Sequence, residues 1–311
     1  MRCATRGGER YERDGEAAQA RTRLAHALAL VALVGACDGT ATPSDADPND
    51  LDGDGIANAA DNCPYQRNLD QHDEDGDRFG DACDNCPDIA NPDQLDTSEM
   101  RDQFPDGVGD ACDLRPGLAG DEIRAFYGFG SASDGDAWTG SGWTIDADAV
   151  SATSAAQWAS KTHEQGDGVM MVARVASLAW PSTSDGALRL AIDGDGVEIG
   201  ATCTLRQDTD GDMRDELVAS ELGGGAETVQ PIDPIPADMP VTLTAWRLIT
   251  ATAGIRHGEV RCMLQIEDVM TGTSVGLADD VIVGNQGLAA SAATVRISSL
   301  IVYASPGPKK P

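Results

Sequence analysis

The chain has 311 residues, of which 52 are Asp or Glu and 22 are Lys or Arg, giving a formal net charge of −30. This acidity excludes nucleic acid as a default partner, because phosphate binding requires basic patches. The length is sufficient for one sizeable hydrophobic core with a smaller module beside it. The charge is concentrated, since 21 acidic residues and three arginines lie between Asp45 and Asp113. That segment has too little apolar surface to fold without further constraints.

Residues 1–36 predict a signal peptide. Six arginines precede an apolar run from Leu24 to Val34, which is too short to span a membrane and ends in small residues. The sequence Val34-Gly35-Ala36-Cys37 resembles the bacterial lipobox, and this resemblance implies that Cys37 is lipidated and becomes the mature N-terminus. An ordinary signal peptide and a buried helix are the alternatives. We therefore expect export to the bacterial cell envelope, as an outer-membrane or surface lipoprotein held by its lipid anchor.

The cysteine content supports export. Of eight cysteines, Cys3 lies within the predicted signal peptide and Cys37 is assigned to the lipid. Six remain, an even number that favours disulfides in an oxidising compartment: Cys63, Cys83, Cys86, Cys112, Cys203 and Cys262. Residues 37–49 form a short polar tether with two prolines, which we expect to be flexible to semi-extended.

An acidic pattern follows the tether and occurs three times in residues 50–113. Its spacing matches positions 1, 3, 5, 9 and 12 of an EF-hand-type calcium loop, in which position 7 adds a backbone carbonyl. Carboxylates this dense repel one another unless a hard cation lies between them. The predicted metal ligands are Asp50, Asp52, Asp54, Ile56, Asn58 and Asp61 in the first loop; Asp73, Asp75, Asp77, Phe79, Asp81 and Asp84 in the second; and Asp102, Asp106, Val108, Asp110 and Asp113 in the third.

The same region repeats itself at a nearly constant interval. The block Asp-Asn-Cys-Pro at 61–64 returns at 84–87, which is 23 residues later. The block Asp-Ala-Cys-Asp at 81–84 returns at 110–113, so six residues are inserted between Asp96 and Asp102. A fixed period of this length is typical of a linear array of structural repeats.

These blocks, together with the Asp-x-Asp-x-Asp-Gly run at 50–55, resemble the thrombospondin type 3 repeat. The resemblance covers about 65 residues, 50–113. It implies a mostly irregular backbone that holds two or more Ca²⁺ ions in tandem. It also implies that consecutive cysteines are bridged, as Cys63–Cys83 and Cys86–Cys112.

Three departures from the pattern weaken individual loops. Arg78 occupies position 6, where the sharp turn usually takes a glycine with positive φ. Phe104 replaces the carboxylate at position 3 of the third loop, and the insert precedes Asp102. Asn58 replaces an aspartate in the first loop but still offers an oxygen. The alternative for any single acidic loop is a solvated turn, which three copies in register with cysteines disfavour.

Residues 125–304 predict a second architecture, after a linker at 114–124 and before a tail at 305–311. Apolar and polar residues alternate with period two, for example in 197–205 and 260–266, and no long amphipathic helix is present. We predict a mainly β fold in which the calcium-bound array is followed by an antiparallel β-sandwich or jelly roll. The segment loosely resembles concanavalin A-like and laminin-G-like sandwiches. Cys203 and Cys262 both lie on inward faces of predicted strands, so we expect a buried disulfide between them.

A fourth acidic loop lies within the sandwich. It offers Asp208, Asp210, Asp212 and Glu216 as weaker candidate metal ligands, and an acidic hairpin tip is the equal alternative. Tryptophans on the surface could stack on sugars, although core packing is the simpler expectation for Trp138, Trp143, Trp158, Trp180 and Trp246.

We expect no catalytic site and no enzyme activity, because the histidines are scattered and no Gly-x-Ser-x-Gly motif is present. The sequence favours an exported, calcium-binding surface protein whose array stiffens a stalk that presents the sandwich for adhesion or binding. The alternatives are a carbohydrate-binding module and a glycan-active enzyme. We expect calcium and the membrane as partners, with glycans or surface proteins as further candidates.

Overall fold

The computed structural model describes residues 47–97, 105–113, 120–146, 148–163, 168–180, 185–194, 200–207, 211–222, 225–252, 255–277 and 285–305. The predicted signal peptide, Cys37, Asp102, Asp208 and Asp210 lie outside these residues. The chain divides into two units, Met1–Asp45 and Ala46–Pro311, and everything described below belongs to the second. No helix in the described part of the chain is long and apolar enough to cross a membrane.

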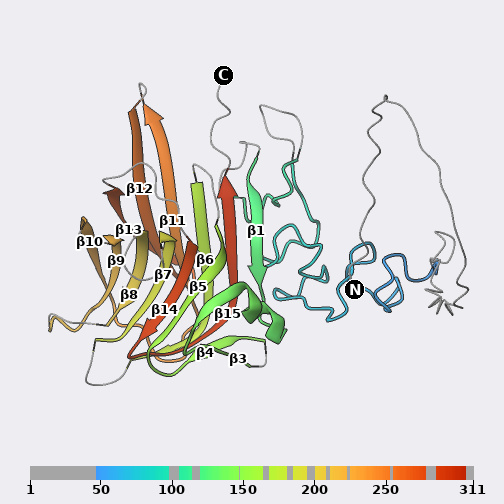
Figure 1. Cartoon of the computed structure of the whole chain (residues 1–311), viewed down its shortest axis with the longest axis horizontal. Helices are drawn as coiled ribbons and strands as arrows, with labels where there is room; N and C mark the ends of the chain where they lie inside the picture. Colours follow the sequence, from blue (N-terminus) through green and yellow to red (C-terminus); the bar gives the residue numbers. More distant parts are fainter. Residues whose placement is uncertain are drawn as a thin grey trace, which may run out of the picture. The chain divides into compact units, whose positions relative to one another are not determined.

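The sandwich consists of two antiparallel sheets (Figure 1). The eight-stranded sheet has the order β13-β12-β11-β6-β15-β4-β3, and β1 also pairs with β15. Its strands are β1 (Glu122–Tyr127), β3 (Thr144–Ile145), β4 (Val150–Ala152), β6 (Gly168–Ala179), β11 (Val241–Thr252), β12 (Ile255–Ile266), β13 (Val269–Leu277) and β15 (Thr294–Ser305).

The seven-stranded sheet has the order β10-β9-β8-β7-β14-β5-β2. Its strands are β2 (Trp138–Ser141), β5 (Ala156–His163), β7 (Ala187–Gly194), β8 (Gly200–Arg206), β9 (Asp215–Leu222), β10 (Glu227–Ile232) and β14 (Asn285–Ser291). A short 3₁₀ helix, η1 (Ala132–Ala137), precedes β2. The prediction of a mainly β fold, with an irregular array followed by an antiparallel sandwich, is confirmed.

The core lies between the two sheets and follows from the alternation along the strands. In β12 the inward residues Val260, Cys262 and Leu264 are buried, while Arg261 between them is exposed. Cys203 of β8 and Cys262 of β12 form a disulfide between the sheets, and both residues are fully buried. The covalent bond therefore joins the two layers of the sandwich through the centre of its core.

An aromatic cluster fills one part of this core. Trp138 packs on Trp158 with ring centroids 5.8 Å apart, and Trp143 lies 6.1 Å from Trp158. All three tryptophans are buried, so the expectation of core packing is correct for them. Trp180 and Trp246 are partly buried and pack against hydrophobic clusters.

The array of residues 47–113 contains no helix or strand among its described residues. Two disulfides cross-link it, Cys63–Cys83 and Cys86–Cys112, which are the pairs that the resemblance implies. Its backbone amides donate to carboxylate and amide side chains or to nearby backbone carbonyls instead of a sheet ladder. Such a segment keeps its shape only while those polar side chains hold their positions.

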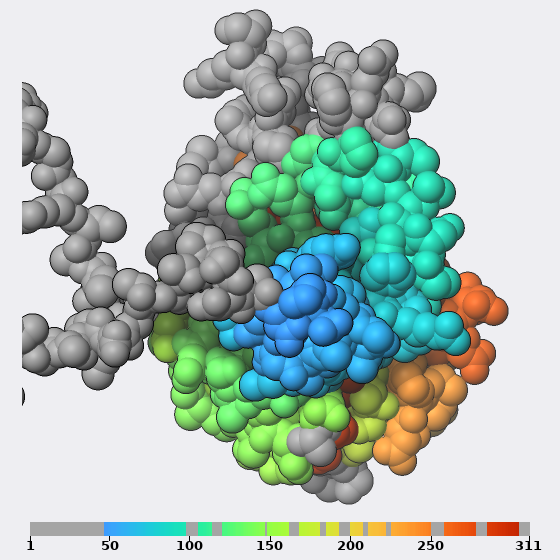
Figure 2. Space-filling model, turned by 90° about the vertical axis from the view of Figure 1, so that its right-hand side faces the viewer, coloured from blue at the N-terminus to red at the C-terminus, as the bar shows by residue number. Residues whose placement is uncertain are grey.

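The second half of the array packs against the outer face of the eight-stranded sheet (Figure 2). The cluster comprises Cys86, Val108 and Cys112 from the array with Met170, Val172, Ile301 and Tyr303 from β6 and β15. Beside it, the Arg174 guanidinium of β6 donates to the Asp88 carboxylate at 3.0 Å and to the Asp88 carbonyl oxygen at 3.1 Å. The array thus contacts the sandwich through Cys86, Asp88, Val108 and Cys112.

Candidate metal centre

The first acidic loop is shaped by bonds between carboxylates and backbone amides. Asp50 accepts hydrogen bonds from the Gly53 amide at 2.8 Å and the Gly55 amide at 3.1 Å. Asp52 accepts from the Asp54 amide at 3.0 Å. Aspartate side chains that bond to the backbone two or three residues on form tight turns. The turns bring one carboxylate oxygen each from Asp50, Asp52 and Asp54 within 4.8 Å of one another.

The second loop repeats this geometry bond for bond. Asp73 accepts from the Gly76 amide at 2.8 Å and the Arg78 amide at 3.1 Å, and Asp75 accepts from the Asp77 amide at 3.0 Å. Asp73, Asp75 and Asp77 again bring carboxylate oxygens within 4.8 Å of one another. The identical bonds show that the repeat in the sequence is also a repeat of local structure.

Both loops have the features that a hard cation requires. The Oδ2 atoms of Asp52, Asp61 and Asp75 are buried and have no hydrogen-bond partner within the protein. Buried carboxylate oxygens are normally satisfied, so these three are available as metal ligands. Burial, together with the repulsion of the neighbouring carboxylates of Asp77, Asp84 and Asp73, raises the pKa of Asp75 to about 6. A divalent cation would offset both effects, so the residues present fit Ca²⁺.

The residues predicted at positions 9 and 12 also brace the loops. Asn58 accepts from the Leu51 amide at 2.9 Å, and Asp81 accepts from the Glu74 amide at 2.9 Å. Asp61 accepts from Gln71 Nε2 at 2.8 Å, and Asp84 accepts from Gln94 Nε2 at 2.7 Å. We did not predict a role for the two glutamines, although each ends an Asn-x-Asp-Gln block, at 68–71 and 91–94, that also recurs after 23 residues. Within the described part of the chain, the carbonyl oxygens of Ile56 and Phe79 accept no hydrogen bond.

The third loop is described at Asp96 and Thr97 and again from residue 105 onward. Asp96 Oδ2 accepts from the Gly107 amide at 2.9 Å. This bond matches those that Asp50 and Asp73 accept from the amides of Gly55 and Arg78. Asp110 Oδ1 accepts from the Thr97 amide at 2.9 Å, just as Asp81 accepts from the Glu74 amide in the second loop. Asp96 therefore makes the bond that Asp50 and Asp73 make in the first two loops, whereas Asp102, the predicted ligand at position 1, lies outside the described residues. Asp106 and Val108 remain close to each other, since the Val108 amide donates to Asp106 at 3.1 Å.

A further bond connects each unit of the array to the next. Asp54 Oδ2 accepts from the Asn68 amide at 3.0 Å, and Asp77 Oδ2 accepts from the Asn91 amide at 2.9 Å. Asp106 Oδ2 accepts from the Gly120 amide at 2.9 Å, across the same separation of 14 residues. Gly120 lies two residues before β1, the first strand of the sandwich. The start of the sandwich thus takes the place of a fourth unit and closes the array.

Arg78 adopts the backbone conformation of the glycine that it replaces. Its φ is 90°, close to the 99° of Gly55 and the 96° of Gly107 at the matching turns. A non-glycine residue in this region is strained by about 1–2 kcal/mol. We expect Arg78→Gly to raise the free energy of unfolding by about 1 kcal/mol relative to Arg78→Ala, which removes the charge without relieving the backbone. Chemical denaturation at fixed calcium concentration measures the difference, and equal stabilities would contradict the strain.

The fourth acidic loop is only partly described. Asp212 is exposed and accepts from the Arg214 amide at 2.8 Å. Glu216 lies on β9, is largely buried, and forms an ion pair with Arg206. Asp215, which we did not predict, accepts from Trp180 Nε1 at 3.1 Å and from the Ile235 amide at 2.9 Å. The candidate ligand Glu216 is therefore already engaged by a cation of the protein.

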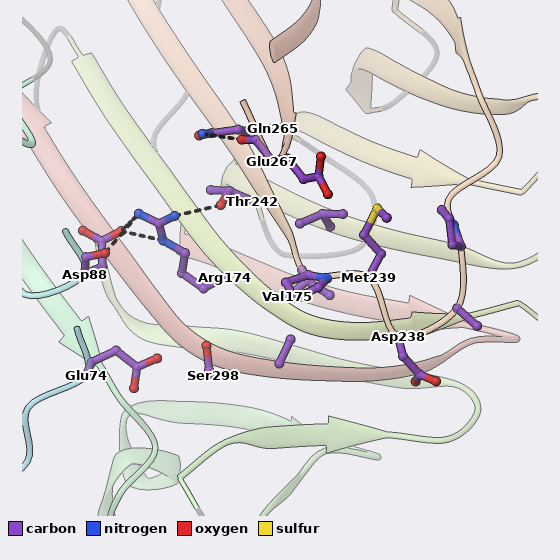
Figure 3. Close-up of a pocket in the computed structure, with 15 residues that line it drawn as sticks. Glu74, Asp88, Arg174, Val175, Asp238, Met239, Thr242, Gln265, Glu267 and Ser298 are labelled. Carbon is purple, nitrogen blue, oxygen red and sulfur yellow. Dashed lines mark hydrogen bonds and ion pairs between the residues drawn. The ribbon is translucent and has the colours of Figure 1, made fainter. Parts of the chain in front are cut away.

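A groove of about 740 Å³ runs along the outer face of the eight-stranded sheet, between the array and residues 236–240 (Figure 3). Arg174 lies within it and donates to Asp88 and to Thr242 Oγ1 at 3.0 Å. Carboxylates line both ends, from Glu74 and Asp88 of the array and from Asp238 and Glu267 of the sandwich. The groove therefore combines acidic side chains with an apolar part of its wall, which includes Met239 and Val241.

Comparisons with known proteins concern the two parts separately. The sandwich is similar to a legume lectin-like domain from Entamoeba histolytica, with 10% identity and a TM-score of 0.41 over 54% of this chain and 90% of that one. It is also similar to a β-1,3-glucanase from Mycobacterium marinum, with 12% identity and a TM-score of 0.41 over 58% of this chain and 98% of that one. A third similar structure is the VIP36 exoplasmic/lumenal domain in a Ca²⁺/Man3GlcNAc-bound form, with 11% identity and a TM-score of 0.42 over 57% of this chain and 87% of that one. No curated protein matches the chain. Residues 44–71, which contain the first acidic loop, match the thrombospondin type 3 repeat family.

Proposed function

We propose that this protein binds calcium through its acidic array and uses the bound ions to hold the array in shape against the β-sandwich. One observation carries the proposal. Two loops, 23 residues apart, arrange three aspartates each by the same hydrogen bonds and leave buried carboxylate oxygens without a partner in the protein. Carboxylates fixed in this way repel one another, and a hard cation is the ligand that relieves the repulsion.

The ions would act mainly on stability. The array has few buried apolar residues, so its ordering entropy is offset by disulfides and by metal. Extracellular calcium modules typically have dissociation constants of about 10⁻⁴–10⁻³ M. We therefore infer that the array is ordered in a calcium-rich exterior and loosens when calcium is withdrawn.

Thermal unfolding with and without calcium tests this proposal. A ligand that binds only the folded state stabilises it by about 2.7 kcal/mol per site when its concentration is a hundred times the dissociation constant. We expect 10 mM calcium to raise the melting temperature of the array and to slow proteolysis within residues 47–113. The same concentration of magnesium is the control. An unfolding curve that is identical in calcium and in chelator would contradict the proposal.

Export and anchoring form the second part of the proposal. Three disulfides in the described residues suggest an oxidising, extracellular environment. The lipid on Cys37 would hold the protein at the cell envelope, where the sandwich is available for adhesion. Intact-mass measurement of the protein from its native host, with Cys37→Ser for comparison, tests the anchor. A mature chain without added lipid mass would remove this part while leaving the calcium proposal intact.

Glycan binding is the second candidate function, and the groove of about 740 Å³ is the observation that favours it. This volume lies in the range of small-molecule sites, and its carboxylates can accept hydrogen bonds from sugar hydroxyls. The buried tryptophans do not contribute, since Trp138, Trp143 and Trp158 are in the core. A glycan array screened in calcium would show selective binding that Glu267→Gln weakens. A glycan screen with no binding signal would exclude this candidate.

A further inference from the structure

His72 connects the second acidic loop to the sandwich. It immediately precedes Asp73, and its Nδ1 lies 2.5 Å from Asp81 Oδ2. Because an ionised carboxylate only accepts, the histidine nitrogen donates this bond. The other oxygen of Asp81 accepts from the Glu74 amide at 2.9 Å, so both carboxylate oxygens are held. The two side chains are largely buried, with exposed fractions of 19% for His72 and 14% for Asp81.

The imidazole ring is in turn held by two glycines of the sandwich. A Cβ atom on Gly130 would lie 2.7 Å from His72 Cδ2, and one on Gly128 would lie 2.9 Å from His72 Cε1. Both distances are shorter than a normal van der Waals contact, so the ring fits only because these residues lack side chains. Phe129, between the two glycines, is 1% exposed and belongs to the sandwich core. The position of the ring is therefore determined by the core of the sandwich.

The other loops brace position 9 differently. In the first loop Asn58 Nδ2 donates to the Pro48 carbonyl at 3.1 Å, which is a contact within the array. In the third loop Asp110 accepts from Thr97 Oγ1 at 3.2 Å, again within the array. Among the bonds of the described residues, the second loop is the one whose position-9 carboxylate is held by a side chain that contacts the sandwich. This difference is specific to one repeat, so the general repeat pattern does not explain it.

We propose that His72 is a positioning residue through which the sandwich sets the placement of Asp81 in the second calcium loop. This inference rests on the proposed function, because it assumes that the loop binds calcium. Two consequences follow. Calcium affinity of the second loop depends on the contact between His72 and residues 128–130, and calcium in that loop in turn strengthens the contact, since such coupling is reciprocal.

Calcium titration of the full chain tests the inference. The first loop is silenced by Asp52→Asn with Asp54→Asn, so that the heat reports mainly on the remaining loops. In this background we expect His72→Ala and Gly130→Ala each to weaken calcium binding at the second loop about tenfold. His72→Asn keeps a donor near the position of Nδ1 and should retain affinity close to that of the parent. Gly276→Ala is the matched glycine control, because its added Cβ would meet nothing within 4 Å.

A double substitution separates positioning from general damage. If Gly130→Ala acts by displacing the imidazole ring, it should cause no further loss of affinity in the His72→Ala background. Unchanged calcium affinity in both single variants would overturn the inference. So would a double variant in which Gly130→Ala lowers the affinity of the His72→Ala chain as much as it lowers that of the parent chain. Loss of affinity in His72→Asn equal to that in His72→Ala would also overturn it. If the chain with all loops intact binds no calcium, the proposed function itself fails, and the two outcomes are thereby distinguishable.

Discussion

We expect Asp77→Ala to abolish calcium binding at the second loop and to lower the stability of the array by about 3 kcal/mol. Asp77 is 8% exposed and performs three tasks at once. It belongs to the carboxylate triad, its Oδ1 accepts from the Phe79 amide at 2.8 Å, and its Oδ2 accepts from the Asn91 amide at 2.9 Å. Hydrogen bonds to charged groups contribute about 1.5–3 kcal/mol each, so removing the side chain costs several of these contributions together. Calcium titration and chemical denaturation measure the two effects.

Two further variants isolate the causes. Asp77→Asn keeps an acceptor for a backbone amide but removes the charge, so it should lose most of the calcium affinity with a smaller loss of stability. Asp93→Ala is the control within the same array, since Asp93 is exposed and makes one long bond of 3.3 Å to the Leu95 amide. Equal calcium affinity in Asp77→Ala and Asp93→Ala would show that the second triad is not a metal site.

Removal of the inter-sheet disulfide is expected to be the largest change in the sandwich. Cys203→Ala with Cys262→Ala opens a cross-link that spans 59 residues and lies fully within the core. In the chain-entropy model a loop of this size contributes about 4 kcal/mol, and the small buried side chains add a minor packing loss. Equilibrium unfolding of the sandwich, followed by tryptophan fluorescence, should report this loss.

The array provides the comparison for this experiment. Cys63→Ala with Cys83→Ala opens a cross-link of 20 residues in the first half of the array, away from the sandwich core. We expect it to reduce calcium affinity while leaving tryptophan-detected unfolding nearly unchanged. A shift below about 1 kcal/mol in the Cys203–Cys262 variant would contradict the stabilising role of the inter-sheet bond.

The two complete acidic loops could be anticipated from the sequence because their bonds are local. Each carboxylate in the triads bonds to a backbone amide two to five residues away, so the spacing of aspartates is sufficient to define the turn. The third loop could not be placed in the same way. Its bonds join Asp96 to Gly107 and Thr97 to Asp110, across an insert whose path the spacing does not specify.

The packing of the array on the sandwich required the structure. The bonds between Arg174 and Asp88 join residues 86 positions apart, and no local pattern predicts such a contact. One signal was nevertheless available. The run from Val169 to Ala173 is apolar on both faces, and Met170 and Val172 point away from the core toward Cys86 and its neighbours. A strand that is apolar on both faces is typically covered on both.

The position of His72 illustrates a second limit. A lone histidine before an acidic loop has no distinctive spacing, and its partners Gly128 and Gly130 lie more than fifty residues away in the chain. Close contact between a ring and glycine backbone depends on how two modules meet in space. The sequence therefore reveals the candidate metal ligands and the interval at which they recur. The residues that position those ligands are identified only from the tertiary structure.

Direct titration of the metal-free chain with calcium, with the number of bound ions counted by equilibrium dialysis, tests the central claim. The two aspartate triads predict at least two calcium ions per chain, with dissociation constants of about 10⁻⁴–10⁻³ M. Asp52→Asn combined with Asp75→Asn should remove both ions, since each substitution takes a buried, unpartnered carboxylate oxygen from one loop. A chain that retains its disulfides and its fold but binds no calcium at 10 mM would contradict the account.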